Sequence, residues 1–374
     1  MTAATLPKSD AGRKSGSELL QNNISILSTP EAAVAHDLTP PDPSPVLELL
    51  GAYRKSKVMF AAISLGIFDE LTNGPMAVAD LARELPADAD ALHRLLGACE
   101  LLGLLQRTEA GYANSPAATA YLTSASPSRM TGYASYTDRV LWQMWDHLDD
   151  AIREGTNRWK QTYGWDQPIF SSFFKDEAAK REFLFGMHGF GVLSSPVVVN
   201  AIDLSKFATF VDLGGATGHL TIAACRRWSN LRGIVFDLPT AIPLAHEVVG
   251  TSEVHDRIAF AEGDFFSDDL PKGDVYALGR ILHDWSETKI DALLAKVYAA
   301  LPSGGAVMIV EKVLHDDKAG PEWAVLQSLN MLVCTEGKER TLSEYENLLT
   351  KAGFGNVTCM RTSVPVDVVL AIKV

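Results

Sequence analysis

The sequence predicts an α/β protein in which a helical N-terminal region precedes a mostly parallel sheet with a reversed strand at its end. Three observations predict this fold. Between Val46 and about residue 200, apolar residues recur at helical spacing. After Ala201, strand, loop and helix patterns alternate, which indicates a parallel sheet covered on both faces. The last two strands are joined by too few residues for a crossover helix, so they must run antiparallel.

Composition and charge limit the classes of partner. A chain of 374 residues with 47% hydrophobic and 21% charged content is long enough for two domains with separate cores. A formal net charge of −13 disfavours nucleic acid and anionic membranes, because both would be repelled by the average surface. We therefore expect a small molecule as partner, with no nucleic acid and no membrane.

Cysteine usage and the N-terminus bear on the compartment. The four cysteines show no paired CxxC spacing, so neither a disulfide framework nor a zinc site is predicted, and a reducing cytoplasm fits best. We find no run of about 18 apolar residues and no apolar core of signal-peptide length at the N-terminus. The sequence therefore predicts a protein that is neither exported nor membrane-bound.

The N-terminal region divides into a leader and a helical domain. Residues 1–44 are rich in Ser, Thr, Pro and Asp without a sustained period, which predicts a disordered leader. Residues 45–125 read as helices, a Pro-marked turn, another helix and two short strands around Glu109-Ala110-Gly111, a winged-helix pattern.

A winged helix raises the possibility of DNA binding. Between Leu47 and Ala125 there are six Lys or Arg against nine Asp or Glu, whereas a DNA-reading face is normally basic. Its helices are also unusually apolar, as faces buried against another subunit are. We favour a homodimer formed through this winged-helix domain over DNA binding.

Residues 126–200 are predicted to be a helical connector that contributes to a substrate pocket. Most of its aromatic residues are expected in the core or at an interface, but some can line a pocket for an aromatic ligand between domains. Trp142 is one candidate for a residue that lines this pocket. These aromatics are Tyr133, Tyr136, Trp142, Trp145, Trp159, Tyr163, Trp165, Phe170, Phe174, Phe183 and Phe190.

Residues 201–374 are predicted to form the catalytic sheet, and its first turn carries glycines. After the strand FVDL the chain reads GGATG and enters a helix. The dinucleotide fingerprint has a different glycine spacing. This turn resembles the D-x-G-x-G-x-G motif for S-adenosylmethionine, with Ala216 in place of the middle glycine. Gly214 lets backbone approach a ligand, and Asp212 suits an ammonium better than a phosphate. The turn favours a methyl donor over NAD.

Acidic side chains follow the next two strands. Asp237 ends IVFD, where it can accept hydrogen bonds from ribose hydroxyls or can cap the following helix. Asp264 and Phe265 follow the third strand, where an acceptor and an aromatic face suit an adenine. Because ligands bind at the carboxyl ends of such strands, these residues together predict one nucleoside site.

The fourth strand ends in GRILHDW, which places His283 at the same edge of the sheet. Histidine changes charge near neutral pH, so His283 is a candidate proton-transfer group. Glu311 ends the fifth strand, and a carboxylate beside an imidazole fixes its tautomer and stabilises the imidazolium. Glu339 is a second candidate, with the alternative of a surface acid paired with Lys338 or Arg340. Arg280 either lies along adenosine or pairs with Asp284 or an acid on the cofactor side.

The residues GDFFSDDLP, RILHDW, SLNMLVCTEGKERT and KAGF, in that order, resemble the plant-type class I S-adenosylmethionine-dependent O-methyltransferases, closest to the acetylserotonin O-methyltransferases. The likeness runs from about Leu47 to Val374. It implies a seven-stranded Rossmann-like methyltransferase sheet, with S-adenosylmethionine as cofactor and His283 as the base, flanked by Glu311 and Glu339. The implied cofactor residues are Gly214, Asp237, Asp264, Phe265 and Arg280. The implied acceptor-pocket residues are Phe183, Met187, Asn330, Met331 and Cys334.

The chain departs from that family at three positions. Phe174 and Gly191 stand where the family has a tyrosine and a tryptophan that contact cofactor, and Phe174 is still expected on the cofactor side. Cys334 stands where the animal enzyme has an amide.

We conclude from the sequence that the chain is an O-methyltransferase acting on a hydroxyl of a small aromatic molecule, an N-acetylserotonin-like indole or a phenol, without a metal. Two alternatives are kept. A nicotinamide-dependent oxidoreductase would share the sheet and Asp237, and a non-catalytic winged-helix regulator would keep the sheet as a ligand sensor.

Overall fold

The computed structural model describes residues 41–165 and 177–374. Almost all of the predicted leader, residues 1–40, and the predicted cofactor residue Phe174 lie outside the described residues. The described residues fall into two units that divide between Leu50 and Gly51. All contacts of the sheet and of the cavity described below lie within the second unit.

The N-terminal elements are helices followed by a hairpin. They are α1 (Ser44–Ser64), α2 (Ile67–Glu70), the 3₁₀ turn η1 (Leu71–Asn73), α3 (Val78–Glu84), α4 (Ala89–Leu101), β1 (Leu105–Thr108), β2 (Gly111–Asn114) and α5 (Pro116–Tyr121). Strands β1 and β2 pair antiparallel, with Thr108 opposite Gly111, as the sequence predicted. Leu105 and Tyr112 are buried with Leu81 and Leu96, so the hairpin shares a core with α3 and α4.

Helices also make up the connector. They are α6 (Thr131–Tyr136), the π-helical η2 (Thr137–Leu141), α7 (Trp142–Trp145), α8 (Leu148–Glu154), α9 (Trp159–Tyr163) and α11 (Glu177–Asn200). Among the described residues, the stretch Phe183–Asn200 of α11 has the length and composition of a membrane span, with 39% of it buried. The stretch is interrupted by His188, Ser194 and Ser195, so it is not the continuous apolar run whose absence the sequence predicts. Helix α11 packs against α6 and α12, as the core helix of a globular domain does.

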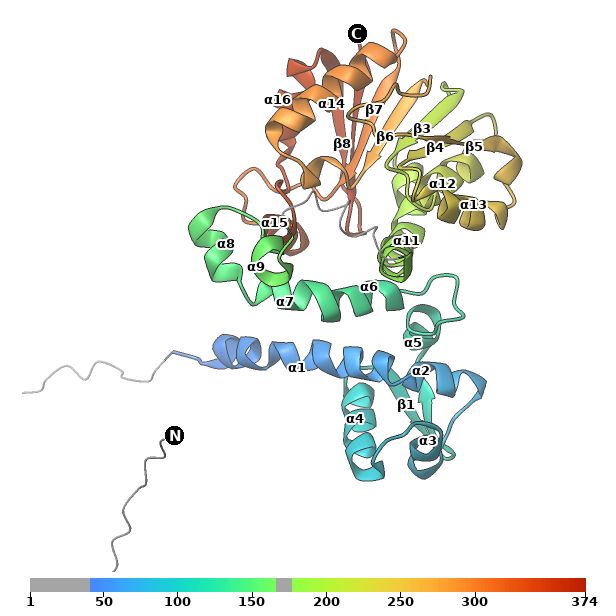
Figure 1. The fold of residues 1–374 in the computed structure, drawn as a ribbon, viewed down its shortest axis with the longest axis vertical. Coiled ribbons are helices and arrows are strands. Elements are labelled where there is room, and N and C mark those ends of the chain that lie inside the picture. The colour runs from blue at the N-terminus through green and yellow to red at the C-terminus, as the bar shows by residue number, and fades with distance from the viewer. Residues whose placement is uncertain (1–40, 166–176) are drawn as a thin grey trace, which may run out of the picture. The chain divides into compact units, whose positions relative to one another are not determined.

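A seven-stranded sheet forms the C-terminal part (Figure 1). Its strands are β3 (Thr209–Leu213), β4 (Arg232–Asp237), β5 (Ile258–Glu262), β6 (Val275–Gly279), β7 (Ala306–Glu311), β8 (Phe354–Met360) and β9 (Asp367–Lys373). Their order is β5-β4-β3-β6-β7-β9-β8. The first five run parallel, and β9 runs antiparallel to both β7 and β8. The predicted methyltransferase sheet with a reversed last strand is confirmed.

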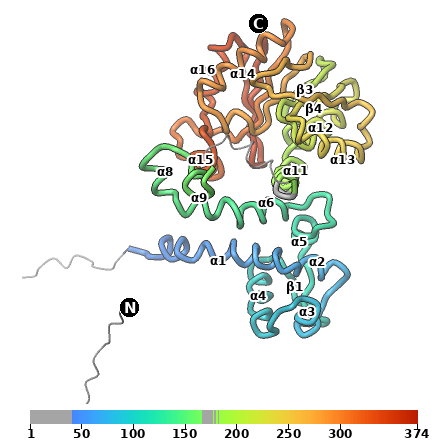
Figure 2. Tube along the Cα trace, viewed as in Figure 1, coloured from blue at the N-terminus to red at the C-terminus, as the bar shows by residue number. Residues whose placement is uncertain are grey.

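Helices and short turns connect these strands. They are α12 (His219–Arg227), α13 (Ile242–Gly250), the 3₁₀ turns η3 (His255–Arg257) and η4 (Leu282–Asp284), α14 (Glu287–Ala300), α15 (Glu322–Cys334) and α16 (Leu342–Lys351). Helices α14 and α16 lie side by side over one end of the sheet in the chain trace (Figure 2).

Alternate residues of the central strands bury two separate cores. Val307 and Ile309 of β7 face a cluster that includes Leu294 of α14. Met308 and Val310 face the other side, where α11 and α12 pack. Since both faces are covered, the central strands are mostly apolar. Asp212 of β3 is buried and accepts the hydroxyl of Thr221. The parallel register brings the carboxyl ends of the strands, with the other acidic residues, to one edge of the sheet.

Candidate active site

One cavity of about 460 Å³ lies at that edge. Its size is within the usual range for ligand sites. The sequence-predicted residues that line it are Gly214, Asp237, Asp264, Phe265, Arg280, His283, Phe183, Met187, Asn330, Met331 and Cys334. The cavity therefore joins the glycine turn, the three acidic or imidazole strand ends and part of the connector in one space.

The glycine turn forms one wall of the cavity. Gly214 has φ +70°, and a Cβ there would lie 2.5 Å from Cδ1 of Ile281. A side chain at position 214 would thus meet both backbone strain and a clash. Ala216, in the middle position, has φ +48°, and its N–H donates to Oδ2 of Asp237 at 2.7 Å. Asp237 at the end of β4 therefore holds the glycine turn that follows β3.

The carboxylate of Asp237 is bound to backbone on both oxygens. Oδ1 accepts the N–H of Leu238 at 2.7 Å. Helix α13 has Ala241 at its N-cap with no side-chain cap, so Asp237 does not cap it, contrary to the alternative considered. Burial raises the pKa of Asp237 to about 6, against the two N–H donors. Each oxygen keeps a second lone pair for a ligand in the cavity.

Asp264 and Phe265 line the cavity after the third strand. The N–H of Phe266 donates to Oδ1 of Asp264 at 2.8 Å, and the N–H of Asp264 donates to Oδ2 of Asp268 at 2.8 Å. The ring of Phe265 packs edge-on against Phe266, with 4.7 Å between centroids. Two hydrogen bonds hold this turn, and both Asp264 and Phe265 line the cavity.

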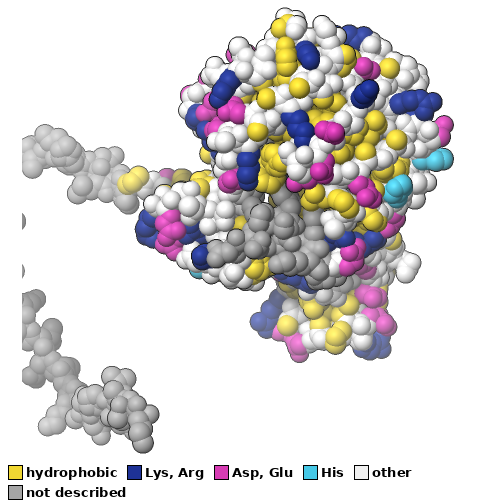
Figure 3. Space-filling model, turned by 45° about the horizontal axis from the view of Figure 1, so that its top comes forward, with side chains coloured by type: hydrophobic (Ala, Val, Ile, Leu, Met, Phe, Trp, Pro, Cys, Tyr) yellow, Lys and Arg dark blue, Asp and Glu magenta, His cyan; other side chains and the backbone are white. Residues whose placement is uncertain are grey.

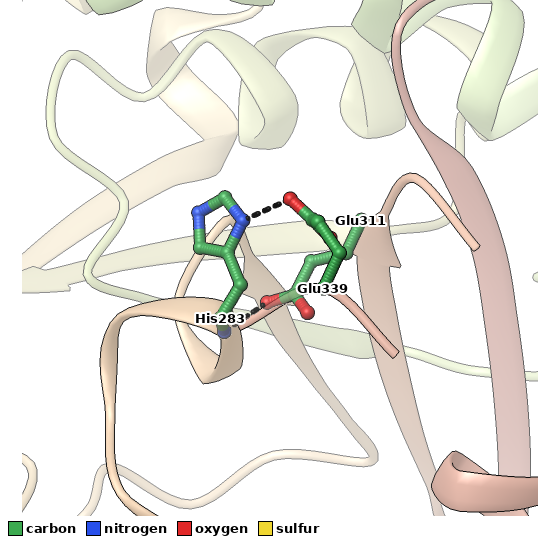
Figure 4. Close-up of side chains that lie close together, drawn as sticks. All are labelled: His283, Glu311 and Glu339. Carbon is green, nitrogen blue, oxygen red and sulfur yellow. Dashed lines mark hydrogen bonds and ion pairs between the residues drawn. The ribbon is translucent and has the colours of Figure 1, made fainter. Parts of the chain in front are cut away.

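His283 is 5% exposed and its imidazole is held by Glu339 (Figure 4). Nδ1 lies 2.7 Å from Oε1 of Glu339. Glu339 is 2% exposed. The alternative of a surface acid paired with Arg340 is wrong, because the buried Arg340 donates to Glu287 and to backbone carbonyls. With Nδ1 committed to Glu339, Nε2 is the nitrogen left for chemistry.

Glu311 holds the backbone of the turn and not the imidazole. Its Oε1 accepts the N–H of Ile281 at 3.1 Å and of His283 at 3.0 Å. Its Oε2 accepts the hydroxyl of the buried Tyr345. The sequence identified both acids, but it placed Glu311 before Glu339 as the partner of the ring, and the structure reverses that order.

Buried charges set the protonation of this cluster. Burial lowers the pKa of His283, but Glu339, Glu311 and Asp284 together raise it to about 9. Burial raises the pKa of Asp284 to about 6, opposed by His283. The second oxygen of Glu339 is buried without a hydrogen-bond partner among the described residues. A positive charge on the ring therefore compensates carboxylates that would otherwise be costly to bury.

Ligand atoms of His283, Glu311 and Glu339 all lie within 4.8 Å of one another, as in a metal site. In this structure, however, three donors already occupy the Glu311 oxygens and the imidazole occupies one oxygen of Glu339. The hydrogen bond between Nδ1 of His283 and Oε1 of Glu339 suits these two groups to share a proton. The expectation that no metal takes part stays a prediction.

The predicted acceptor residues lie on α11 and α15. Asn330 has its carbonyl oxygen fixed by two donors, Nε1 of Trp145 at 2.9 Å and Sγ of Cys334 at 3.6 Å. Its NH₂ group is therefore the part available to a ligand. Burial raises the pKa of Cys334, so the thiol is neutral.

Trp142 is not brought to the cavity. Its ring packs edge-on against Phe60, 6.3 Å between centroids, and lies 4.1 Å from the amine of Lys57. Trp159 lines the cavity instead, together with Tyr133 and Tyr136. The sequence shows all the aromatic residues of the connector. Which of them point into the cavity depends on how the short helices pack, and the spacing of residues in the sequence does not predict that.

Asp284 and His219 are among the lining residues that sequence reasoning missed. Asp284 was considered only as a partner of Arg280, although it is part-buried beside His283, with 3.8 Å between Nε2 and Oδ1. His219, the first residue of α12, was not considered. Its position directly after the glycine turn was the available signal.

Comparison with known proteins identifies the family. Residues 145–355 match the model of the O-methyltransferase domain, and residues 47–124 match the O-methyltransferase dimerisation domain. The chain is 39% identical to acetylserotonin O-methyltransferase of Bos taurus, over 87% of this chain and 96% of that protein. It is 37% identical to the human enzyme of that name, over 85% and 94%.

Solved structures agree. Human N-acetylserotonin methyltransferase in complex with S-adenosylmethionine superposes with a TM-score of 0.84 and 34% identity, covering 91% of this chain and 99% of that one. PigF with S-adenosylhomocysteine gives 0.82 and 28%, covering 89% and 100%.

The chain belongs to the O-methyltransferase family with an N-terminal dimerisation domain. It is an S-adenosylmethionine-dependent O-methyltransferase, and the oxidoreductase and regulator alternatives fall away.

The residues present fit that cofactor. The glycine turn approaches the cavity without a side chain at Gly214, Asp237 retains acceptor capacity, and Phe265 offers an aromatic face in the same space. All are chemically suited to a nucleoside with an amino-acid tail.

Glu339→Gln should lower the pKa of His283 by about 1 to 3 units, because an anion that favours the imidazolium is removed. Titration of the ring carbons by NMR of histidine-labelled protein measures it. Glu346→Gln, an exposed change on α16, is the matched control and should leave the titration unaltered. An unchanged value in Glu339→Gln would contradict the assigned electrostatic coupling.

Proposed function

We propose that this methyltransferase uses His283 as a general base to methylate a hydroxyl on a small aromatic acceptor, an N-acetylserotonin-like indole or a phenol. The observation that carries the proposal is the imidazole itself, which shares one cavity with the glycine turn while Glu339 holds its Nδ1. A phenolic hydroxyl has a free pKa near 10 and is a weak nucleophile at neutral pH, so it needs a base.

The residues divide the work as follows. Nε2 of His283 takes the hydroxyl proton of the acceptor, and Glu339 stabilises the imidazolium that results. Glu311 fixes the backbone of the turn, so the ring stays in place when its charge changes. General-base help of this kind is worth about 10²- to 10⁴-fold in rate.

S-adenosylmethionine, when bound, supplies an activated methyl group. Gly214, Asp237, Asp264, Phe265 and Arg280 are the residues we assign to holding it, by their place on the cavity wall. The buried walls exclude water, which would otherwise compete for the methyl group, and they orient the acceptor oxygen.

The acceptor end favours a flat aromatic ring. Trp159, Phe183, Met187, Met331 and Cys334 present apolar surface there, and the NH₂ of Asn330 offers a donor to an acceptor group on the ligand. The relatives named for acetylserotonin suggest an indole. Cys334 stands where the animal enzyme has an amide, and its neutral thiol adds apolar surface to this part of the pocket.

We also propose that the homodimer forms through residues 45–125 as a winged-helix domain, that residues 126–200 close the acceptor pocket, and that residues 201–374 bind the cofactor. Large exposed apolar side chains gather on α1, and Leu101 of α4 is 87% exposed, as expected of an uncovered interface. On the face drawn in Figure 3, Lys and Arg alternate with Asp and Glu without a broad basic area. We expect no nucleic-acid or membrane partner and a cytoplasmic location.

Asp237→Ala should weaken S-adenosylhomocysteine binding by about 10- to 100-fold, the cost of lost hydrogen bonds to a charged group. Isothermal calorimetry measures the Kd. Asp256→Ala, an exposed change in η3, is the control. If the Kd in Asp237→Ala matches wild type, Asp237 only ties the glycine turn.

His283→Ala should lower kcat at least about a hundredfold while the Kd for S-adenosylhomocysteine stays within about threefold. His255→Ala, in the exposed η3, serves as control. In the wild type, kcat/KM should rise as pH increases towards about 9, because only the neutral imidazole accepts a proton. Full turnover without the ring rules out the base assignment.

A panel of hydroxylated aromatics tests the acceptor class. We expect methyl transfer to N-acetylserotonin or to another indolic or phenolic hydroxyl, and none to the same compounds already carrying the methyl ether. Mass spectrometry of the products measures transfer. Transfer to an aliphatic alcohol or an amine alone would refute an aromatic hydroxyl acceptor.

A further inference from the structure

At position 191 of α11, the cavity wall has no side chain, and an imidazole from another helix fills the space. A Cβ at Gly191 would lie 2.3 Å from three ring atoms of His219, Cγ, Cδ2 and Nδ1. No side chain can coexist with the ring at that distance. The observed position of the His219 ring therefore requires glycine at position 191, although the two residues are far apart in the sequence.

The ring is fixed by a hydroxyl one turn further along α11. Nδ1 of His219 lies 2.9 Å from Oγ of Ser195, which is 1% exposed. Burial, reinforced by His188 and Arg280, lowers the pKa of His219 to about 3. The imidazole is neutral, so one nitrogen accepts and the other donates. In the tautomer in which the Ser195 hydroxyl donates to Nδ1, the ring hydrogen is on Nε2.

A cation lies on the same part of the cavity wall. The guanidinium of Arg280 stacks on Phe190, the residue before Gly191, with 4.9 Å to the ring centroid. Within residues 41–165 and 177–374, no carboxylate lies within ion-pair distance of it. Arg280 and His219 both line the cavity, as do Gly191 and Ser195. A fixed positive charge beside an N–H donor is suited to a carboxylate.

We propose that His219 binds the carboxylate of the cofactor's amino-acid moiety through Nε2–H, beside Arg280. Gly191 leaves the space that the His219 ring needs for this contact. The inference rests on S-adenosylmethionine as cofactor. The acidic strand ends, Asp237 and Asp264, are unsuited to an anion and belong to the nucleoside part. The imidazole, which comes from α12, occupies the space that a side chain at position 191 of α11 would otherwise fill.

The test compares two ligands that differ only at the amino-acid end. S-adenosylhomocysteine carries the carboxylate, and 5′-methylthioadenosine keeps the adenosine and thioether without it. By calorimetry, His219→Ala should raise the Kd for S-adenosylhomocysteine about tenfold, the size of one hydrogen bond to a charged group. The Kd for methylthioadenosine should stay within about twofold. Equal losses for both ligands, or no loss for either, would overturn the proposal.

His188→Ala is the matched control. His188 is a second neutral histidine, 6.3 Å from His219 between ring centroids, and it bonds Oγ1 of Thr217. It should change the Kd for both ligands by the same factor or by none. A selective loss for S-adenosylhomocysteine in this variant would also contradict the assignment to His219.

Gly191→Ala tests whether the position of the His219 ring matters while the imidazole itself is kept. The methyl group must displace the ring, so the variant should show the same selective loss as His219→Ala, and the double variant should lose no more than either single change. Additive losses would contradict a shared contact. If His219→Ala does not fold by circular dichroism, Ser195→Ala supplies the second variant, with the same selectivity and a smaller loss. Retained methylthioadenosine binding separates this outcome from failure of the cofactor site as a whole.

Discussion

The parallel register of β3, β4, β6 and β7 is the constraint on which the site depends. It brings a glycine turn, an acidic tip, a histidine turn and Glu311 to one edge, although these segments lie far apart between Gly214 and Glu311 in the sequence. Because both faces of the sheet are covered by helices, this edge is the place where polar side chains can meet without interrupting the cores. Glu311 then couples neighbouring strands, since it ends β7 and accepts backbone N–H groups from the turn after β6.

The same edge gathers more negative charge than a buried site ordinarily tolerates. Glu339, Glu311 and Asp284 surround one imidazole, and a hydroxyl and backbone donors supply part of the compensation. These carboxylates stabilise the positive charge of the His283 imidazolium, so no additional cation is needed to balance it. Tyr345 shows the cost of the arrangement: burial, followed by the neighbouring Glu311, raises the pKa of its phenol well above the usual value, so it acts as a donor only.

Strand-borne features were predictable from the sequence pattern itself, whereas the helix-borne pocket residues that were named correctly, such as Asn330 and Met187, followed from the family resemblance. The periods of the strands and the acids at their ends predicted the sheet, the glycine turn and His283. The choice between Glu311 and Glu339 as partner of the ring was not available, because Glu339 lies in an irregular segment after α15 that folds back over the turn after β6. Trp142 and Trp159 looked alike in the sequence, yet one packs on Phe60 and the other lines the cavity. Contacts between helices distant in the sequence, such as Gly191 with His219, leave no local pattern.

Three histidines near this cavity show how environment assigns roles to one residue type. His283 lies among carboxylates, which raise its pKa to about 9, whereas burial beside hydroxyl groups and cations lowers that of His188 to about 4 and that of His219 to about 3. The first can exchange a proton within the range of enzyme activity, and the other two are neutral throughout it. A neutral imidazole next to Arg280 adds a directional donor without adding repulsion. A charged histidine at position 219 would oppose both Arg280 and a cationic cofactor, so the desolvation that makes His219 a poor base is what makes it compatible with that wall of the site.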